Sequence, residues 1–174
     1  MARNSNKEIR IVVDDSVIDT GDIMAIIEPV WESVYMCEGE DEYINELKKF
    51  SKPQKYAFAM FWYMCEVDNG GHEQFYYNSA GIAWEDAIEG FGEAGLLEVQ
   101  KILKESAKRL GGNPSKDRQE RIRQLENIKP NFDDLDESYY ELEEETHEAL
   151  ADYIKKNRQA FYFNGVVSKP QGNR

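Results

Sequence analysis

Residues 66 to 81 read Glu-Val-Asp-Asn-Gly-Gly-His-Glu-Gln-Phe-Tyr-Tyr-Asn-Ser-Ala-Gly, and the rest of the chain is best understood outward from them. The run before them, Lys55 to Val67, is apolar on nearly every side of a helix, so other helices should enclose it. Asn69-Gly70-Gly71 then supplies residues that accept left-handed geometry, which ends a helix and turns the chain sharply. The sequence therefore predicts a corner where this central helix meets a short second helix, residues 71 to 78.

Apolar residues keep helical spacing on both sides of this corner, from Ile23 to Phe161. A capping box at Ser51 to Gln54 should begin the central helix. Pro29 must sit in the first turns of its helix or kink it. The other expected helices cover residues 23–34, 43–47, 84–91, 96–110 and 115–128, and one last helix ends near residue 161. We therefore predict one compact all-α domain over residues 9–163, with a loose N-terminus (1–8), a C-terminal tail (164–174) and minor short strands at 9–13 and 162–167.

Composition limits the possible functions. The chain has 174 residues, of which 41% are hydrophobic, so it can build one real core. It carries 34 acidic against 21 basic residues, a net charge of -13, which argues against direct binding of nucleic acid and favours a basic partner. Cys37 and Cys65 form no Cys-x-x-Cys pair and suit buried, reduced thiols. Because residues 1–10 lack an apolar segment and no run is long enough to span a membrane, we expect a cytoplasmic protein without membrane association.

The strongest charge bias lies between Asp133 and Glu148, a segment without a single Lys or Arg. On one continuous helix, five of its acids fall within roughly 80° of one another, opposite an apolar face. A solvated helix face is the simplest interpretation, and acids in a first turn also suit the helix dipole. The alternative is a partner-binding acidic surface made of Asp133, Asp134, Glu137, Glu141, Glu144, Glu145 and Glu148, joined by Glu40, Asp41 and Glu42 from a solvated loop.

The spacing of these charges sets a condition on the second interpretation. Five charges along one helix give roughly one per 5 to 6 Å, whereas duplex DNA has one per about 1.7 Å of its axis. A surface that imitates a duplex therefore needs further acids, such as those between Glu38 and Glu46, or the same stripe from a second subunit. A homodimer is accordingly a possible arrangement.

Glu66-Val67, Asn69-Gly70-Gly71, Gln74-Phe75 and Asn78 resemble the signature of the bacterial family named after DNA mimic protein nineteen, many members of which carry only a domain-of-unknown-function label. The resemblance extends from about residue 23 to 161, and it departs at His72, where an aromatic residue is expected. It implies a helical fold and, for the namesake, an acidic surface that imitates duplex DNA toward a DNA-binding protein. It implies no catalytic residues.

The signature itself admits two interpretations. Its residues are Glu66, Asn69, Gly70, Gly71, Gln74, Phe75 and Asn78. The polar members can bond the backbone at the helix corner, because buried polar groups must be satisfied. They can also line a pocket for a small molecule or a peptide, which would use the same amides and aromatic rings.

Catalytic and metal-binding patterns are incomplete. Glu144-x-x-His147 resembles half of a two-metal site, but a second Glu-x-x-His and any His-Glu-x-x-His are missing. Cys65 with His72 could act as nucleophile and base, although a buried structural thiol is the better interpretation. Asn69-Gly70-Gly71 is too short for a phosphate-binding loop. We therefore expect no metal, no cofactor and no enzymatic activity.

Three hypotheses follow. The first is an acidic protein that mimics duplex DNA and occupies the DNA-binding surface of a basic protein such as a transcriptional regulator. The second is a ligand-binding domain or an unrecognised enzyme that uses the corner from Glu66 to Asn78. The third is a helical interaction module without mimicry.

Overall fold

The computed structural model describes residues 7–169 and confirms a compact all-α fold. Within this range, two short 3-10 turns and one two-stranded sheet accompany the helices. The helices are α1 (Asp15–Ile18), α2 (Ile23–Ser33), α3 (Glu40–Leu47), α4 (Lys52–Tyr77), α5 (Trp84–Ala94), α6 (Leu97–Arg109), α7 (Arg118–Ile128), α8 (Asp133–Tyr140) and α9 (Glu143–Lys156). The turns are η1 (Ser79–Ala83) and η2 (Arg158–Phe161), and the strands are β1 (Lys7–Val13) and β2 (Phe163–Lys169).

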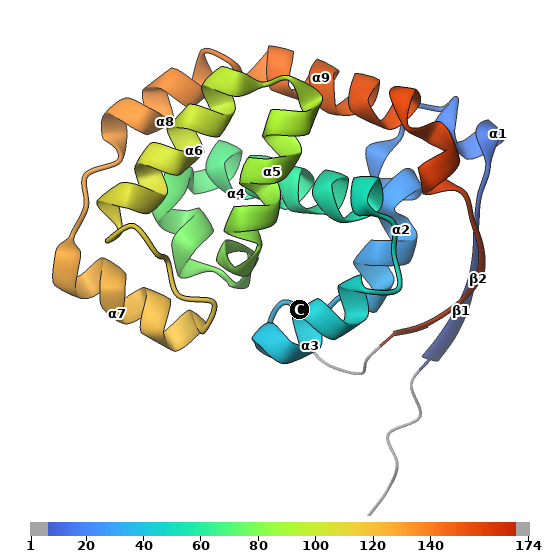
Figure 1. Ribbon diagram of the computed structural model, residues 1–174, viewed down its shortest axis with the longest axis horizontal. Coiled ribbons are helices and arrows are strands. Elements are labelled where there is room, and N and C mark those ends of the chain that lie inside the picture. The colour runs from blue at the N-terminus through green and yellow to red at the C-terminus, as the bar shows by residue number, and fades with distance from the viewer. Residues whose placement is uncertain (1–6, 170–174) are drawn as a thin grey trace, which may run out of the picture.

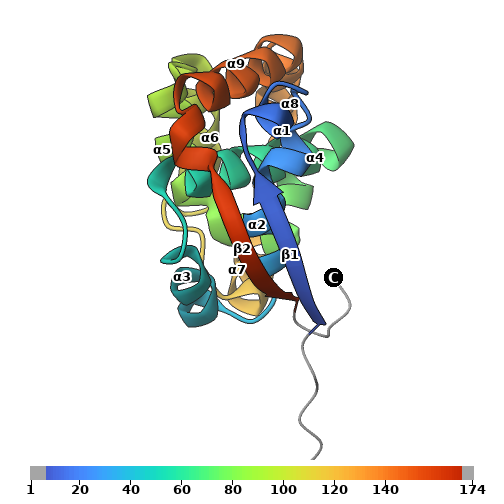
Figure 2. The ribbon, with the colours of Figure 1, turned by 90° about the vertical axis from the view of Figure 1, so that its right-hand side faces the viewer.

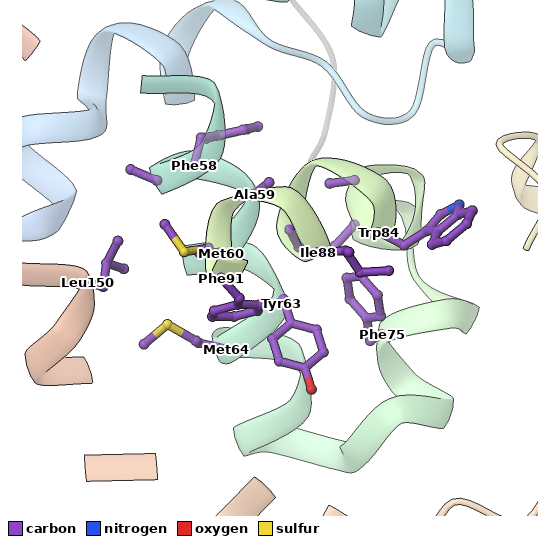
Figure 3. Close-up of a cluster of buried hydrophobic side chains, with 14 of the residues drawn as sticks. Phe58, Ala59, Met60, Tyr63, Met64, Phe75, Trp84, Ile88, Phe91 and Leu150 are labelled. Carbon is purple, nitrogen blue, oxygen red and sulfur yellow. The ribbon is translucent and has the colours of Figure 1, made fainter. Parts of the chain in front are cut away.

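Helix α4 is the centre of the fold, and α2, α5, α7, α8 and α9 all pack against it. It begins as predicted, because the Ser51 side chain accepts a bond from the Gln54 backbone and the Gln54 side chain accepts one from the Ser51 backbone. Figure 1 shows α4 crossing the molecule behind α5. Its buried Tyr63 ring meets Phe75 and Phe91 edge to face, with ring centroids 5.2 Å apart in both pairs, as Figure 3 illustrates.

The predicted corner is present as a kink inside α4. Gly70 has φ -162° and ψ 24°, and Gly71 has φ 73° and ψ -174°. The left-handed residue is therefore Gly71 alone, whereas Gly70 is extended in φ, which any residue can adopt. The second half of the helix ends at Tyr77, and the amide of Asn78 still bonds the carbonyl of Gln74.

The two strands pair antiparallel, from Lys7 opposite Lys169 to Val13 opposite Phe163, and so join the two ends of the described chain. Figure 2 shows this ribbon running down one side of the helices. Ile11, Val13 and Val167 are buried against the core. The short strands near the termini are confirmed, and both extend beyond the expected domain limits of residues 9 and 163. The outer parts of the expected loose ends, residues 1–6 and 170–174, lie outside the described residues.

Two expectations about helices were wrong. The predicted last helix is two helices, α8 and α9, separated at Glu141 and Leu142. The break lets each part bury its own apolar residues against the core, Leu135 and Tyr139 from α8 and Leu150 from α9.

The acids Glu40, Asp41 and Glu42 do not form a loop but the first turn of α3. Negative charge is favoured there, at the positive end of the helix dipole.

One expectation about burial was also wrong. Cys37, in the loop after α2, and Cys65, on an open face of α4, are both exposed. The charges of α7 are typical of a surface helix, yet its Arg121 is fully buried.

Arg121 donates to backbone carbonyls of Tyr76 (2.6 Å), Asn78 (2.7 Å) and Ser115 (2.6 Å), and loss of hydration lowers its pKa to about 10.

Among residues 7–169, no helix has both the length and the apolar character that crossing a membrane requires.

Candidate functional site

Three polar side chains of the signature come together across the kink. The Oε2 atom of Glu66 accepts hydrogen bonds from Nε2 of Gln74 and from Nδ2 of Asn78, both at 2.8 Å. The turn brings these side chains close enough to bond one another, and these bonds are made between side chains rather than to the backbone. Asn69 stays apart from this group and is exposed. Glu66 thus links both halves of α4 to the residue that ends it.

His72 forms a second link, between the kink and α8. Its backbone N–H donates to Oδ1 of Asp136 at 2.9 Å, and its Nδ1 contacts the same oxygen. Its Nε2 lies 2.9 Å from the hydroxyl of Tyr63. His72 fits the aromatic position of the signature because the ring is fully buried between Tyr63 and Phe132.

Asp136 does not cap a helix, although Asp is a common N-cap residue. Helix α8 begins earlier, at Asp133, so Asp136 is free to receive the N–H of His72. The first residues after the kink lack intrahelical partners for their N–H groups, and a carboxylate satisfies one of them.

A Cys65 and His72 catalytic pair finds no support. His72 is enclosed and bonded to Tyr63 and Asp136, whereas Cys65 faces solvent. Partial loss of hydration, together with the carboxylates of Asp68 and Glu66, raises the pKa of the Cys65 thiol to about 11. The thiol is therefore protonated near neutral pH and is a weak nucleophile.

A cavity of about 260 Å³ adjoins the signature corner. It lies between the end of α2 with its following loop and α4, and Trp31, Tyr35, Met36, Trp62, Glu66 and Asn78 line it. Trp31 and Trp62 stack with ring centroids 4.5 Å apart and planes within 3° of parallel. The cavity therefore combines an aromatic wall with one nearly buried carboxylate.

The acidic residues predicted as a partner-binding surface divide into two groups. Helices α8 and α9 follow one another along one edge of the molecule, which we call the α8–α9 edge (Figure 1). The α3 acids Glu40, Asp41 and Glu42 are exposed but lie at the opposite end in both views (Figures 1 and 2). They cannot add to the charge of the α8–α9 edge.

Most acids of the α8–α9 edge have no cationic partner. Asp134 is the exception, because Arg109 holds both of its oxygens, at 2.6 and 2.8 Å, and the hydrogen bonds lower the pKa of Asp134. The break between the helices also ends the single stripe expected on one continuous helix. Among residues 7–169, no Lys or Arg forms an ion pair with the seven remaining exposed acids, Asp133, Glu137, Glu141, Glu143, Glu144, Glu145 and Glu148.

One cluster of metal-ligating side chains was missed. Asp68, Glu143 and His147 place ligand atoms within 4.8 Å of one another. The sequence signal was the spacing of Glu143 and His147, four residues apart on one helix, but Asp68 is distant in the chain. His147 is exposed, and its Nε2 lies 3.2 Å from Oδ2 of Asp68. That contact explains the arrangement without a metal ion.

The fold and the site define a class: an acidic all-α protein built on one kinked central helix, with polar side chains bonded across the kink. A family model described as DMP19-like protein matches residues 48–157, and the chain belongs to this family. The resemblance read from the signature is thereby confirmed. Searches of curated proteins and of solved structures found no match.

Proposed function

We propose that this protein occupies the DNA-binding surface of a basic protein, such as a transcriptional regulator, by imitating the charge of DNA with the α8–α9 edge. The observation that carries the proposal is the run of seven exposed acids between residues 133 and 148 without a Lys or Arg partner among residues 7–169. Charges that are not neutralised within the chain remain available to a cationic partner. The proposal includes the cytoplasmic location expected from the sequence.

Charge density supports the proposal within limits. Residues 133 to 148 cover roughly 22 Å at about 1.5 Å per residue, so seven acids give roughly one charge per 3 to 4 Å. One strand of DNA has a phosphate per 3.4 Å of axis, and the duplex has one per about 1.7 Å. The charge density of a single edge therefore matches that of one DNA strand at most, because its acids point in different directions around two helices. Imitation of both strands needs a second copy, and the proposal accordingly includes a homodimer.

The test compares two variants that lose the same charge at opposite ends of the molecule. The edge variant replaces Glu137, Glu141, Glu144 and Glu148 by Gln. The control variant replaces Glu38, Glu40 and Glu42 by Gln and Asp41 by Asn. All eight side chains are exposed, so both variants should fold with nearly unchanged melting temperatures.

The partner is first captured from lysate of the source cell and identified by mass spectrometry. Fluorescence anisotropy then follows release of a labelled DNA duplex from that partner. The wild type and the control variant should displace the duplex, and the edge variant should need at least tenfold higher concentration. Displacement should weaken steeply as salt rises from about 50 to 200 mM, because salt screens charge over about a Debye length.

The proposal fails if the partner keeps its DNA while bound to this protein, or if the edge and control variants behave alike. Binding without DNA displacement would instead favour a helical interaction module.

A further inference from the structure

We propose that the cavity at the signature corner binds a small organic cation, an ammonium or guanidinium group on a short apolar stem. This site is separate from the α8–α9 edge and does not depend on the function proposed for that edge.

The carboxylate of Glu66 determines the charge of the ligand. Glu66 is only 9% exposed, and its Oε2 atom already accepts the bonds from Gln74 and Asn78. Its Oε1 atom receives no hydrogen bond from residues 7–169 and is not among their fully enclosed polar atoms, so water or a ligand in the cavity can reach it. A cation that takes the place of this water meets the negative charge directly.

No cationic side chain of the described chain supplies that charge. The lining contains neither Lys nor Arg. An anionic ligand would be repelled by Glu66, and a neutral apolar ligand would displace water from the carboxylate without replacing its hydrogen bonds. A cation that also donates a hydrogen bond, or simply lies against Oε1, resolves both problems.

The aromatic wall favours an organic cation over a metal ion. Trp31 and Trp62 line the cavity as a stacked pair, which leaves each indole one outer face, and indole faces attract ammonium and guanidinium groups. Met36 and Val34 add apolar surface for a stem. Metal ions instead need several strong ligands, and among residues 7–169 Glu66 belongs to no group of three His, Cys, Asp or Glu side chains that could hold one.

The cavity sets the size of the ligand. Its volume of about 260 Å³ is large enough for a compact cation on a short apolar stem. We therefore assign the site to a free small molecule.

Tryptophan fluorescence provides a direct reading, because two of the three tryptophans line the cavity. The third, Trp84, is held elsewhere by a bond from its Nε1 to the carbonyl of Pro114 at 3.1 Å. The probes are choline and methylguanidinium, each titrated at constant ionic strength into the full-length protein. Their neutral counterparts, 3,3-dimethylbutan-1-ol and N-methylurea, match them in shape.

At least one cation should cause a saturable fluorescence change, and its neutral counterpart should bind at least tenfold more weakly. Glu66→Gln should lower the affinity for that cation at least tenfold and remove the preference over the neutral counterpart. The Gln side chain can still accept bonds from Gln74 and Asn78, so the variant should fold. The control Glu73→Gln changes an exposed acid on the same helix and should leave the affinity within twofold.

Trp62→Leu keeps an apolar side chain but removes one ring, and it should weaken binding of the cation at least fivefold. This variant tests the site even if Glu66→Gln does not fold. The proposal is overturned if neither cation binds saturably, if the neutral counterparts bind equally well, or if folded Glu66→Gln or Trp62→Leu binds like the wild type.

Discussion

Replacement of Gly71 by Ala is the sharpest test of how the corner is built. The backbone at Gly71, with φ 73° and ψ -174°, lies in a region that only glycine adopts readily. A Cβ atom built there would lie 2.3 Å from Oδ2 of Asp136. Gly71→Ala therefore combines backbone strain with displacement of the carboxylate that holds His72.

The expected cost follows from these two effects. Strain in this region costs about 1 to 3 kcal/mol. Loss of the hydrogen bonds between Asp136 and His72 adds about 1.5 to 3 kcal/mol to this cost. Alanine also makes the unfolded chain less flexible, which offsets about 0.4 to 1 kcal/mol of the destabilisation. Gly71→Ala should thus lower the free energy of unfolding by about 2 to 5 kcal/mol. At about 2 to 4 °C per kcal/mol, the melting temperature should fall by at least about 4 °C.

Gly95→Ala is the matched control. Gly95 also has positive φ, 82°, but an added Cβ atom would meet nothing within 4 Å. Its cost should be about 1 kcal/mol or less, since strain and the gain from the unfolded chain nearly cancel. Urea unfolding of both variants measures the difference. The contact with Asp136 is refuted if the two costs agree within about 0.5 kcal/mol, or if removing the Asp136 side chain does not reduce the cost of Gly71→Ala.

Two further predictions concern charged groups. Arg121→Met should lower the free energy of unfolding by about 3 to 5 kcal/mol, because it leaves buried carbonyls without a donor. Arg123→Met, on the exposed face of α7, is the control and should cost about 1 kcal/mol or less in the same urea experiment. Arg109 lowers the pKa of Asp134 in the folded state. The ion pair therefore stabilises the fold above the unfolded pKa of about 3.9, and this stabilisation is lost as pH falls through the folded pKa. Wild type and Asp134→Asn should differ in stability at neutral pH and converge below about pH 4, and parallel curves throughout would refute the ion pair.

Local patterns predicted most of the helices. Ser51 and Gln54 form a capping box within four residues. The helical spacing of Leu135, Tyr139 and Leu150 indicates a buried face, whether the helix is continuous or broken. The break at Glu141 and Leu142 has no such signal, because neither residue is a helix breaker. It arises from packing, since α8 packs against α4 and α6, whereas α9 packs against α4 and α5.

The site was predictable only where its residues are neighbours in sequence. Glu66, Gln74 and Asn78 lie within one signature, so their grouping could be expected, although not that they bond one another. Trp31 reaches the same cavity from α2, and Asp136 reaches His72 from a position 64 residues away. Contacts of that kind depend on the fold, and helical periodicity carries no information about which apolar faces meet.

The kink also determines where the acidic edge lies. Helix α8 is fastened to the corner by Asp136 at His72 and by the hydroxyl of Tyr140, which donates to the carbonyl of Val67 at 3.1 Å. Both contacts reach residues within five positions of Gly71, on either side of the turn. Because these contacts lie on both sides of the kink, a change in the kink angle would break at least one of them, whereas α9 packs against α4 and α5. In the function proposed for the α8–α9 edge, a rigid corner keeps the spacing of the acids constant, and charge complementarity depends on that spacing.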